Sequence, residues 1–264
     1  MKTKSIFSNK PVLIGVVHLR PLPGSPRWSG TIKAVTDFAM ADARAYERGG
    51  ADAIFVENFG DAPFAKGAVE TETLTAMTAI GCAVRAEVNF PIGFNVLRND
   101  ARAALALCAA CGGSYIRVNV HTGAMLTDQG VIEGDAYNTA RYRERICPGV
   151  EIFADVHVKH AVTLGDWSLE NAAQDTAERG LADALIVSGV GTGHSADIAD
   201  VECVRQACPK SRILLGSGVN VRNVKEYLRL ADGVIVGSSL KRDGKLSNPV
   251  DPKRVAALVK AMKR

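Results

Sequence analysis

The sequence predicts an α/β protein built as a single (β/α)8 TIM barrel of the phosphate-binding type, and two observations lead to this prediction. Short runs rich in Val and Ile recur eight times along the 264 residues, and a stretch of helical composition follows each run. Strict alternation of strand and helix implies a parallel sheet covered by helices, because parallel neighbours need crossover connections. Eight such units in about 250 residues match the size of a closed barrel. We therefore expect one domain over residues 1–264.

The eight strand candidates are short and β-branched. In chain order they read VLIGVVHL, DAIFVEN, PIGFNVL, SYIRVNVH, VEIFADVHVK, DALIVSGV, SRILLGSG and DGVIVGSS, beginning at Val12, Asp52, Pro91, Ser114, Val150, Asp183, Ser211 and Asp232. The stretches between them, such as TIKAVTDFAMADARAYERGG, are rich in residues that favour helices. A doubly wound open sheet is the alternative fold, but the first strand lacks the G-x-G-x-x-G turn typical of it.

The two kinds of connection differ in length and composition. Helix-to-strand links such as ERGGAD and ERGLAD are short and supply the Gly that ends a helix. Strand-to-helix links such as RPLPGSPRWSG and HTGAMLTDQGVIEGD are longer and richer in Pro, Gly and polar residues. In barrel enzymes the strand-to-helix loops build the active face, so we expect the site at the carboxyl-terminal rim.

The composition narrows the class of protein. A hydrophobic fraction of 47% and a charged fraction of 23% are ordinary for a globular domain. The net charge of +4 is not gathered in a basic block, which argues against a nucleic-acid partner. No segment reaches the roughly 18 apolar residues of a membrane span, and the basic start has no export-signal pattern. We expect a cytoplasmic protein without integral membrane association that forms a homo-oligomer, as barrels of this size often do.

The stretch EIFADVHVKH, residues 151–160, alternates with the period of a β-strand. Its apolar row, from Ile152 to Val158, is expected to face the helices. Its other row runs from the barrel interior toward the rim and contains, in order, Phe153, Asp155, His157 and Lys159.

Polar residues also end several other strands, and we expect them to converge on the same rim. They are His18, Glu57, Asn58, Asn95, Asn119, His121 and Ser188. For any one of them, a structural role explains its position as well as a site role does. It could be a strand-end residue whose hydrogen bonds are satisfied or a helix cap. The group is harder to explain that way, because burying unpaired charged groups costs several kcal/mol. The predicted catalytic set is Asp155, His157, Lys159, Glu57, His18, Asn95 and Asn119.

Two glycine turns predict a phosphate site. The seventh strand ends in LLGSGVN, residues 214–220, and the eighth in VIVGSSLK, residues 234–241. Many barrels hold a phosphate at these two turns, because Gly allows close approach and backbone N–H groups favour an anion. The predicted phosphate residues are Gly216, Ser217, Gly218, Gly237 and Ser238. The alternative is that these residues serve only the tight turns.

No cofactor is predicted with certainty. A divalent metal is compatible with the residue types of Glu57, Asp155 and His157, although the sequence has no H-E-x-x-H motif. Cys108 and Cys111 form a C-x-x-C inside an Ala-rich run without a second pair, which favours small buried helix residues over a metal or redox site.

Long segments of the sequence resemble the BtpA/SgcQ family. They are KPVLIGVVHLRPLPGSPRW, ADAIFVENFGDAPF, IGFNVLRNDARAALALCAACGGSYIRVN, FADVHVKH and GSGVNVRNVKEYLRLADGVIVGSSLKRDG. The resemblance covers nearly the whole chain, and the family is similar to the ribulose-phosphate-binding group of barrels, which implies the fold. It does not imply one function, because the cyanobacterial branch is associated with photosystem I biogenesis and other members resemble sugar-metabolism proteins.

Two classes of function follow from these observations. The first is an enzyme that acts on a phosphorylated sugar or similar small phosphate ester by aldol-type cleavage, isomerisation or epimerisation. Asp155 or Glu57 would be the base and His157 or His18 the acid, while Lys159 would polarise a carbonyl or form a Schiff base. The second is a non-catalytic assembly factor that retains a phosphate-binding barrel.

Overall fold

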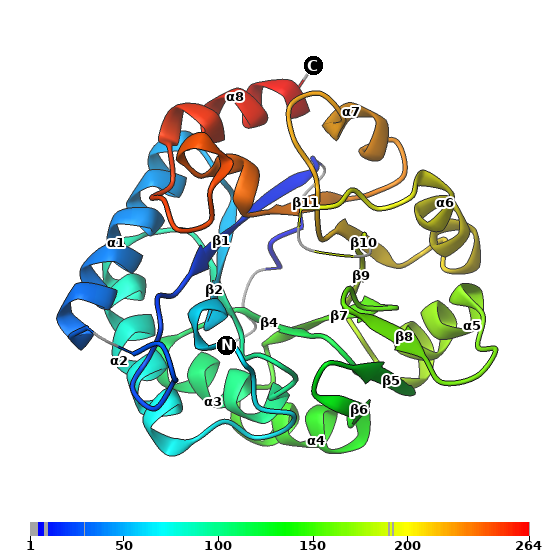
Figure 1. Ribbon diagram of the computed structural model, residues 1–264. Helices are drawn as coiled ribbons and strands as arrows, with labels where there is room; N and C mark the ends of the chain where they lie inside the picture. Colours follow the sequence, from blue (N-terminus) through cyan, green and yellow to red (C-terminus); the bar gives the residue numbers. More distant parts are fainter. Residues whose placement is uncertain (1–4, 8–9, 29, 190, 192, 264) are drawn as a thin grey trace.

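The eight predicted strands form a closed parallel barrel, which confirms the predicted fold (Figure 1). The structure, a computed structural model, describes residues 5–7, 10–28, 30–189, 191 and 193–263. Around the barrel the strand order is β1-β11-β10-β9-β7-β4-β3-β2. The strands are β1 (Val12–His18), β2 (Ala53–Glu57), β3 (Ile92–Asn95), β4 (Tyr115–Val118), β7 (Glu151–Val156), β9 (Ala184–Val187), β10 (Arg212–Leu215) and β11 (Gly233–Val236).

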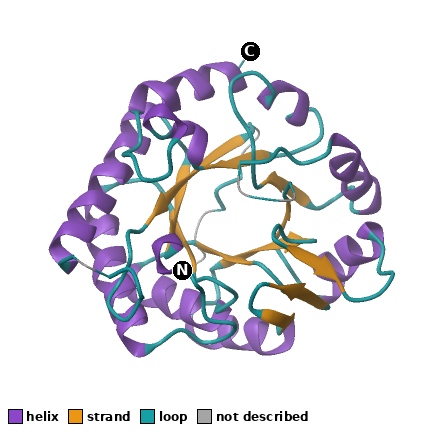
Figure 2. Cartoon of the chain, viewed as in Figure 1, coloured by secondary structure: helices purple, strands orange, loops and turns teal. Residues whose placement is uncertain are grey.

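Helices surround the barrel and cover the outer faces of the strands (Figure 2). They are α1 (Ile32–Gly49), α2 (Thr71–Glu87), α3 (Ala101–Cys111), α4 (Ala136–Ile146), α5 (Leu169–Gln174), α6 (Ile198–Ala207), α7 (Val224–Tyr227) and α8 (Pro252–Met262). A π-helical turn, η2 (Asp175–Arg179), continues α5, and short 3-10 turns lie at η1 (Phe59–Asp61), η3 (Ser238–Leu240) and η4 (Arg242–Gly244). Side chains cap several helices; for example, Asp100 accepts a hydrogen bond from the Ala103 N–H at the start of α3.

A small antiparallel sheet, which the sequence did not predict, is built from the loops that follow β4 and β7. Its strands are β5 (Ala124–Thr127), β6 (Gly130–Glu133) and β8 (Ala161–Thr163), in the order β6-β5-β8. Figure 1 shows the three strands together beside α4 and α5. This sheet covers one side of the carboxyl-terminal rim, next to the ends of β4 and β7. It therefore affects which residues of the rim line the same cavity.

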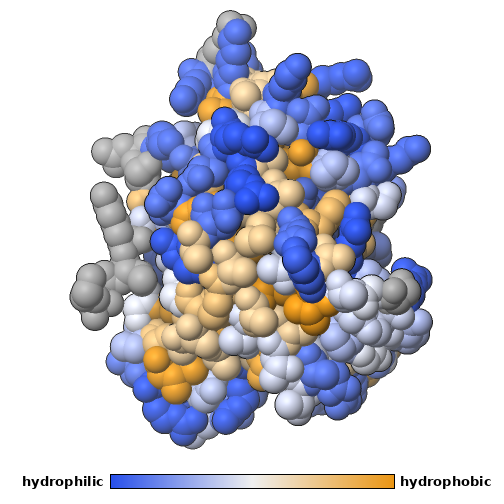
Figure 3. Space-filling model, turned by 90° about the vertical axis from the view of Figure 1, so that its left-hand side faces the viewer, coloured by the Kyte–Doolittle hydropathy of each residue, from blue (hydrophilic) through white to orange (hydrophobic). Residues whose placement is uncertain are grey.

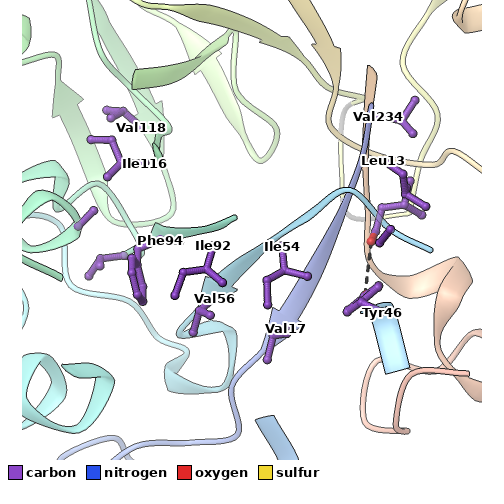
Figure 4. Packing of buried hydrophobic residues seen from close by; sticks show 14 of the residues in the cluster. Leu13, Val17, Tyr46, Ile54, Val56, Ile92, Phe94, Ile116, Val118 and Val234 are labelled. Carbon is purple, nitrogen blue, oxygen red and sulfur yellow. Dashed lines mark hydrogen bonds between the residues drawn. The ribbon is translucent and has the colours of Figure 1, made fainter. Parts of the chain in front are cut away.

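Alternation along the strands separates two sets of buried side chains. The outward set packs against the helices and includes Leu13, Val17, Ile54, Ile92 and Ile116 (Figure 4). The inward set fills the barrel and includes Val12, Ile14, Phe55, Tyr115, Phe153, Ile186 and Leu214. The predicted inward position of Phe153 is thus confirmed.

Three aromatic rings form a floor under the carboxyl-terminal half of the barrel. The Tyr115 ring centroid lies 4.8 Å from that of Phe55 and 5.0 Å from that of Phe153. The Tyr115 hydroxyl donates a 2.6 Å hydrogen bond to the Ile54 carbonyl, which satisfies its buried polar atom. Gly93 makes room for this ring, since a Cβ there would lie 2.2 Å from the Tyr115 ring. The inward residues above this floor are mostly polar.

The strand β7 ends earlier than the sequence alternation predicts. It stops at Val156, and His157 has a φ of 51° in the left-handed region. The predicted row Asp155, His157 and Lys159 is therefore wrong as a continuous strand face, because the backbone turns at its middle member.

The surface over α1 and α2 carries hydrophilic residues around a central band of weakly hydrophobic ones (Figure 3). No helix in the described part of the chain is both long enough and apolar enough to cross a membrane.

Candidate active site

A cavity of about 180 Å³ opens at the carboxyl-terminal end of the barrel, above the aromatic floor. Eight of the twelve predicted site residues line it: His18, Glu57, Lys159, Gly216, Ser217, Gly218, Gly237 and Ser238. The register explains this convergence, because His18 lies opposite Glu57, and Glu57 opposite Asn95, at the ends of β1, β2 and β3. We call this space the mouth cavity.

A buried ion pair lies at the base of the mouth cavity. The Nε and Nη2 atoms of Arg117 each donate a 2.8 Å hydrogen bond to Asp155, and both side chains are at most 4% exposed. The Asn119 amide and the Ser188 hydroxyl each donate a further 2.9 Å bond to the same carboxylate. Burial would raise the pKa of Asp155, but the charge and hydrogen bonds of Arg117 and the bonds from Asn119 and Ser188 lower it overall.

This pairing changes the expected role of Asp155. A carboxylate that accepts four hydrogen bonds and has a lowered pKa is a poor proton acceptor. Asp155 instead orients the Arg117 guanidinium, which lines the mouth cavity. Arg117 was not among the predicted site residues, although it lies in the same inward row as Tyr115 and Asn119 and the strand alternation indicates it.

Among the described residues, one neighbour forms a hydrogen bond with the Glu57 side chain. The Asn95 amide, itself buried, donates a 2.5 Å hydrogen bond to Glu57 Oε2. Glu57 Oε1 accepts no hydrogen bond from any residue that the structure describes, and the side chain lines the mouth cavity. Asn95 does not line the cavity, so it positions Glu57 from below.

His18 lies between the end of β1 and the turn after β11. Burial lowers the pKa of His18 well below its usual value, and the charges of Lys241, Lys159 and Arg117 lower it further, so the imidazole is neutral at pH 7. Its Nδ1 atom is buried and has no hydrogen-bond partner in the described chain. A Cβ at Gly237 would lie 2.5 Å from His18 Cε1, so glycine is needed at this position for close approach.

Lys159 reaches the mouth cavity from the loop after β7. Burial and the charge of Arg117 lower the pKa of Lys159, and the carboxylates of Glu57 and Asp155 only partly oppose this shift. The buried Arg98, which follows β3, donates a 2.6 Å hydrogen bond to the Lys159 carbonyl and so fixes the loop. Arg98 was not among the predicted site residues, because nothing in the local sequence pattern indicates this contact.

The two glycine turns present backbone donors to the mouth cavity. The N–H groups of Ser217, Gly218, Ser238 and Ser239 donate to no acceptor among the described residues. The Gly216 N–H is not available, because it donates to the Val187 carbonyl. Gly216 instead provides space, since a Cβ there would lie 2.9 Å from the Ser188 hydroxyl oxygen. Gly218 has a φ of +65°, which favours glycine.

Three predicted catalytic residues line a different space. Asn119, Asp155 and His157 line a second cavity of about 270 Å³. The structure therefore does not bring Glu57, Asp155 and His157 together as the expected metal ligands. In the described part of the chain, no group of three or more His, Cys, Asp and Glu side chains is arranged to hold a metal ion.

Other residues that the sequence suggested for the site form hydrogen bonds with nearby loops or are buried in a helix. Asn58 binds the Leu97 backbone N–H and Asp61, and His121 binds the Gly180 carbonyl. Cys108 and Cys111 are buried on α3 among apolar neighbours.

Comparison with known proteins identifies the family. Residues 8–264 match the BtpA family, so the chain belongs to it, as the resemblance indicated. The chain is 47% identical to a protein of Synechocystis sp. described as "Photosystem I biogenesis protein BtpA", over 97% of this chain and 89% of that protein. It is 33% identical to the "Putative sgc region protein SgcQ" of Escherichia coli, over 96% of this chain and 94% of that protein.

Solved structures support the fold. Phosphoribosyl anthranilate isomerase from Thermus thermophilus superposes with a TM-score of 0.58 at 14% identity, covering 96% of this chain and 98% of that chain. At this identity the likeness shows a shared (β/α)8 architecture and no more.

Proposed function

We propose that this member of the BtpA family is an enzyme that binds a small phosphate ester in the mouth cavity and catalyses proton transfer next to a carbonyl group. Aldol-type cleavage, isomerisation and epimerisation all contain such a step. The observation that best supports this proposal is the combination of unpaired backbone N–H groups and two cationic side chains with one available carboxylate in one cavity.

The phosphate group of the proposed ligand would bind at the two glycine turns. Ser217, Gly218 and Ser238 offer N–H groups, and Arg117 Nη2 lies 3.5 Å from the position that a Gly216 Cβ would take. Backbone donors of this kind bind anions without a loss of side-chain entropy. The guanidinium adds a charge that Asp155 holds in place.

Glu57 is the best candidate for the general base. One of its oxygens is fixed by Asn95 and the other is available to a ligand in the mouth cavity. Asp155, by contrast, is fully engaged and serves to position Arg117. General-base catalysis requires a carboxylate that can reach the proton it removes, and Glu57 meets this geometric condition.

Lys159 and the neutral His18 complete the proposed machinery. A protonated Lys159 polarises the substrate carbonyl, and a neutral one attacks it to form a Schiff base, in which nitrogen replaces the carbonyl oxygen and water leaves. The lowered pKa of Lys159 increases its neutral fraction. His18 exchanges a proton with the oxygen that gains charge. Borohydride trapping with a substrate distinguishes the two roles of Lys159.

Thermal-shift titration tests ligand binding. Inorganic phosphate and a panel of sugar phosphates are titrated, and a ligand at 100 times its Kd adds about 2.7 kcal/mol to the free energy of unfolding. Lys159→Met should weaken phosphate binding about tenfold or more, because a charge-assisted hydrogen bond is lost. Lys245→Met, an exposed lysine outside the mouth cavity, is the matched control. Equal affinities in the two variants would contradict the proposal.

A second candidate function comes from the 47% identity to a protein described as a photosystem I biogenesis protein. In that case the barrel would bind a phosphorylated ligand and act through assembly rather than catalysis. The variant Glu57→Gln distinguishes the two candidate functions. A biogenesis role would survive this substitution in a complementation assay, whereas an enzymatic role would not.

The proposal also includes a cytoplasmic location and self-association. The ordinary composition of the chain supports the former, and the weakly hydrophobic band over α1 and α2 supports the latter (Figure 3). Sedimentation equilibrium measures the association directly, and a monomer at all concentrations would remove self-association from the proposal.

A further inference from the structure

The second cavity is lined by residues at the ends of β4 and β7, in β5 and β8, and in the helix α5. Figure 1 shows where these elements lie. Its wall combines polar residues with the apolar side chains of Met125, Val158, Leu164, Trp167 and Ala172. Its volume of about 270 Å³ exceeds the roughly 150 Å³ that suffices for benzene in a protein interior. Among the described residues, none lines both this space and the mouth cavity. We call it the side cavity.

One residue that lines the side cavity, Asn119, carries an unsatisfied acceptor. Asn119 is only 2% exposed, and its amide nitrogen donates to Asp155. This bond fixes the orientation of the amide, so Oδ1 is the acceptor end, and it is buried with no hydrogen-bond partner in the described chain. The Nε2 atom of His157 is also buried without a described partner. Buried polar atoms are normally paired, so two residues of this lining have polar groups that the described chain leaves unsatisfied.

The charges around the side cavity determine whether a cationic or an anionic ligand is favoured. Asp155 and Asp175 contribute carboxylates, whereas no Lys or Arg is found among the described lining residues. The Asp155 charge is already balanced by Arg117. Asp175 has only a loose contact of 3.6 Å with the exposed Arg179. A cationic ligand is therefore favoured over an anionic one.

The entrance of the side cavity exposes apolar surface. Leu164 is 48% and Trp167 52% exposed, although both are large hydrophobic residues that line the cavity. An aromatic face near a carboxylate is a typical environment for an organic ammonium group. A ligand with an apolar body would cover this surface on binding.

We propose that the side cavity is a second binding site and that it takes a small arylalkylamine. The ring packs against Met125, Leu164 and Trp167, the ammonium group lies beside Asn119, and Asp175 balances its charge. This site differs in charge and position from the mouth cavity and does not depend on the function proposed there.

Fluorescence of Trp167 tests this proposal. The chain has two tryptophans, so Trp28→Phe leaves Trp167 as the only reporter. Benzylamine should change the Trp167 emission saturably, whereas benzoate, of similar shape and opposite charge, should not. Asp175→Asn in the same background should weaken benzylamine binding about twofold to fivefold, as expected for a partly exposed charge pair. Glu178→Gln, which removes an exposed charge from the same helical turn outside the cavity, should not change it.

Several outcomes would overturn the proposal. They are the absence of a saturable change with benzylamine, an equal change with benzoate, and an equal loss of affinity in Asp175→Asn and Glu178→Gln. Repeating the titration with saturating inorganic phosphate separates the two sites. An unchanged benzylamine affinity supports independent cavities, whereas competition would mean one continuous site and would contradict the proposal. A failure to bind phosphate would affect only the proposed function.

Discussion

The mouth cavity and the side cavity are each lined by one member of the same buried ion pair, yet they favour ligands of opposite charge. The mouth cavity contains Arg117, Lys159 and backbone N–H groups without an acceptor among the described residues, which favour an anion. The side cavity contains apolar residues, Asp175 and Asn119, whose amide oxygen has no partner in the described chain, and these favour a cation. Asp155 connects the two, because it lines the side cavity and binds Arg117, which lines the mouth cavity. A single buried acid can thus organise two sites without acting in the chemistry of either.

Removal of Asp155 should have the largest effect on stability. Asp155→Ala leaves the Arg117 guanidinium buried without its partner, so the free energy of unfolding should fall by about 3–5 kcal/mol. Urea denaturation measures the change. The double variant Asp155→Leu with Arg117→Met should recover most of the loss, because it removes both charges. A loss below about 1 kcal/mol in Asp155→Ala would show that the pair does not organise the rim.

Glu57→Gln should affect only the mouth cavity. If Glu57 is the base, turnover of a substrate should fall about 100-fold or more. Phosphate should bind at least as tightly, because a negative charge leaves the mouth cavity, and benzylamine affinity should stay the same. Steady-state kinetics and thermal-shift titrations on the same samples provide the measurements. Glu202→Gln, on the exposed face of α6, is the control for the loss of a charge. Full activity in Glu57→Gln would exclude this residue as the base.

Ser188→Ala should show whether the two cavities depend separately on the hydrogen bonds to Asp155. The substitution removes one hydrogen bond to the carboxylate on the β9 side and leaves the Asn119 bond intact. The free energy of unfolding should fall by about 1.5 kcal/mol, and phosphate affinity should weaken while benzylamine affinity does not. Equal weakening of both ligands would mean that the two cavities respond together.

The smallest expected effect is on the pH dependence of stability. The pKa of His18 is lowered in the folded state, so the unfolded state binds more protons at mildly acidic pH. The free energy of unfolding should therefore rise with pH from the folded pKa up to about 6.5, the unfolded value, and then level off. His18→Gln should reduce this slope, while His194→Gln, an exposed histidine, should not. An unchanged slope in His18→Gln would argue against a buried neutral imidazole.

The barrel itself could be predicted from the sequence because its signal is local. Alternation within each strand assigns Ile152 and Phe153 to opposite faces, and the structure agrees. The same alternation placed Glu57 and His18 at the rim, where they line one cavity.

The predictions that were wrong concern features that the local sequence pattern does not indicate. Nothing in the residue type of His157 indicates a left-handed backbone, yet that turn moves its side chain away from Lys159. The strands β5, β6 and β8 have three or four residues each, and β5 pairs with β8 across the whole of α4 and β7. The role of Asp155 depends on Arg117, a partner 38 residues away, so a list of polar strand ends could not distinguish a base from a positioning residue.

A crystal structure determined in the presence of inorganic phosphate tests the central claim most directly. We expect phosphate in the mouth cavity, within hydrogen-bond distance of the N–H groups of Ser217, Gly218 and Ser238 and close to Arg117 and Lys159. A mouth cavity that contains only water at a phosphate concentration well above any metabolic level, or phosphate bound only elsewhere on the surface, would contradict it.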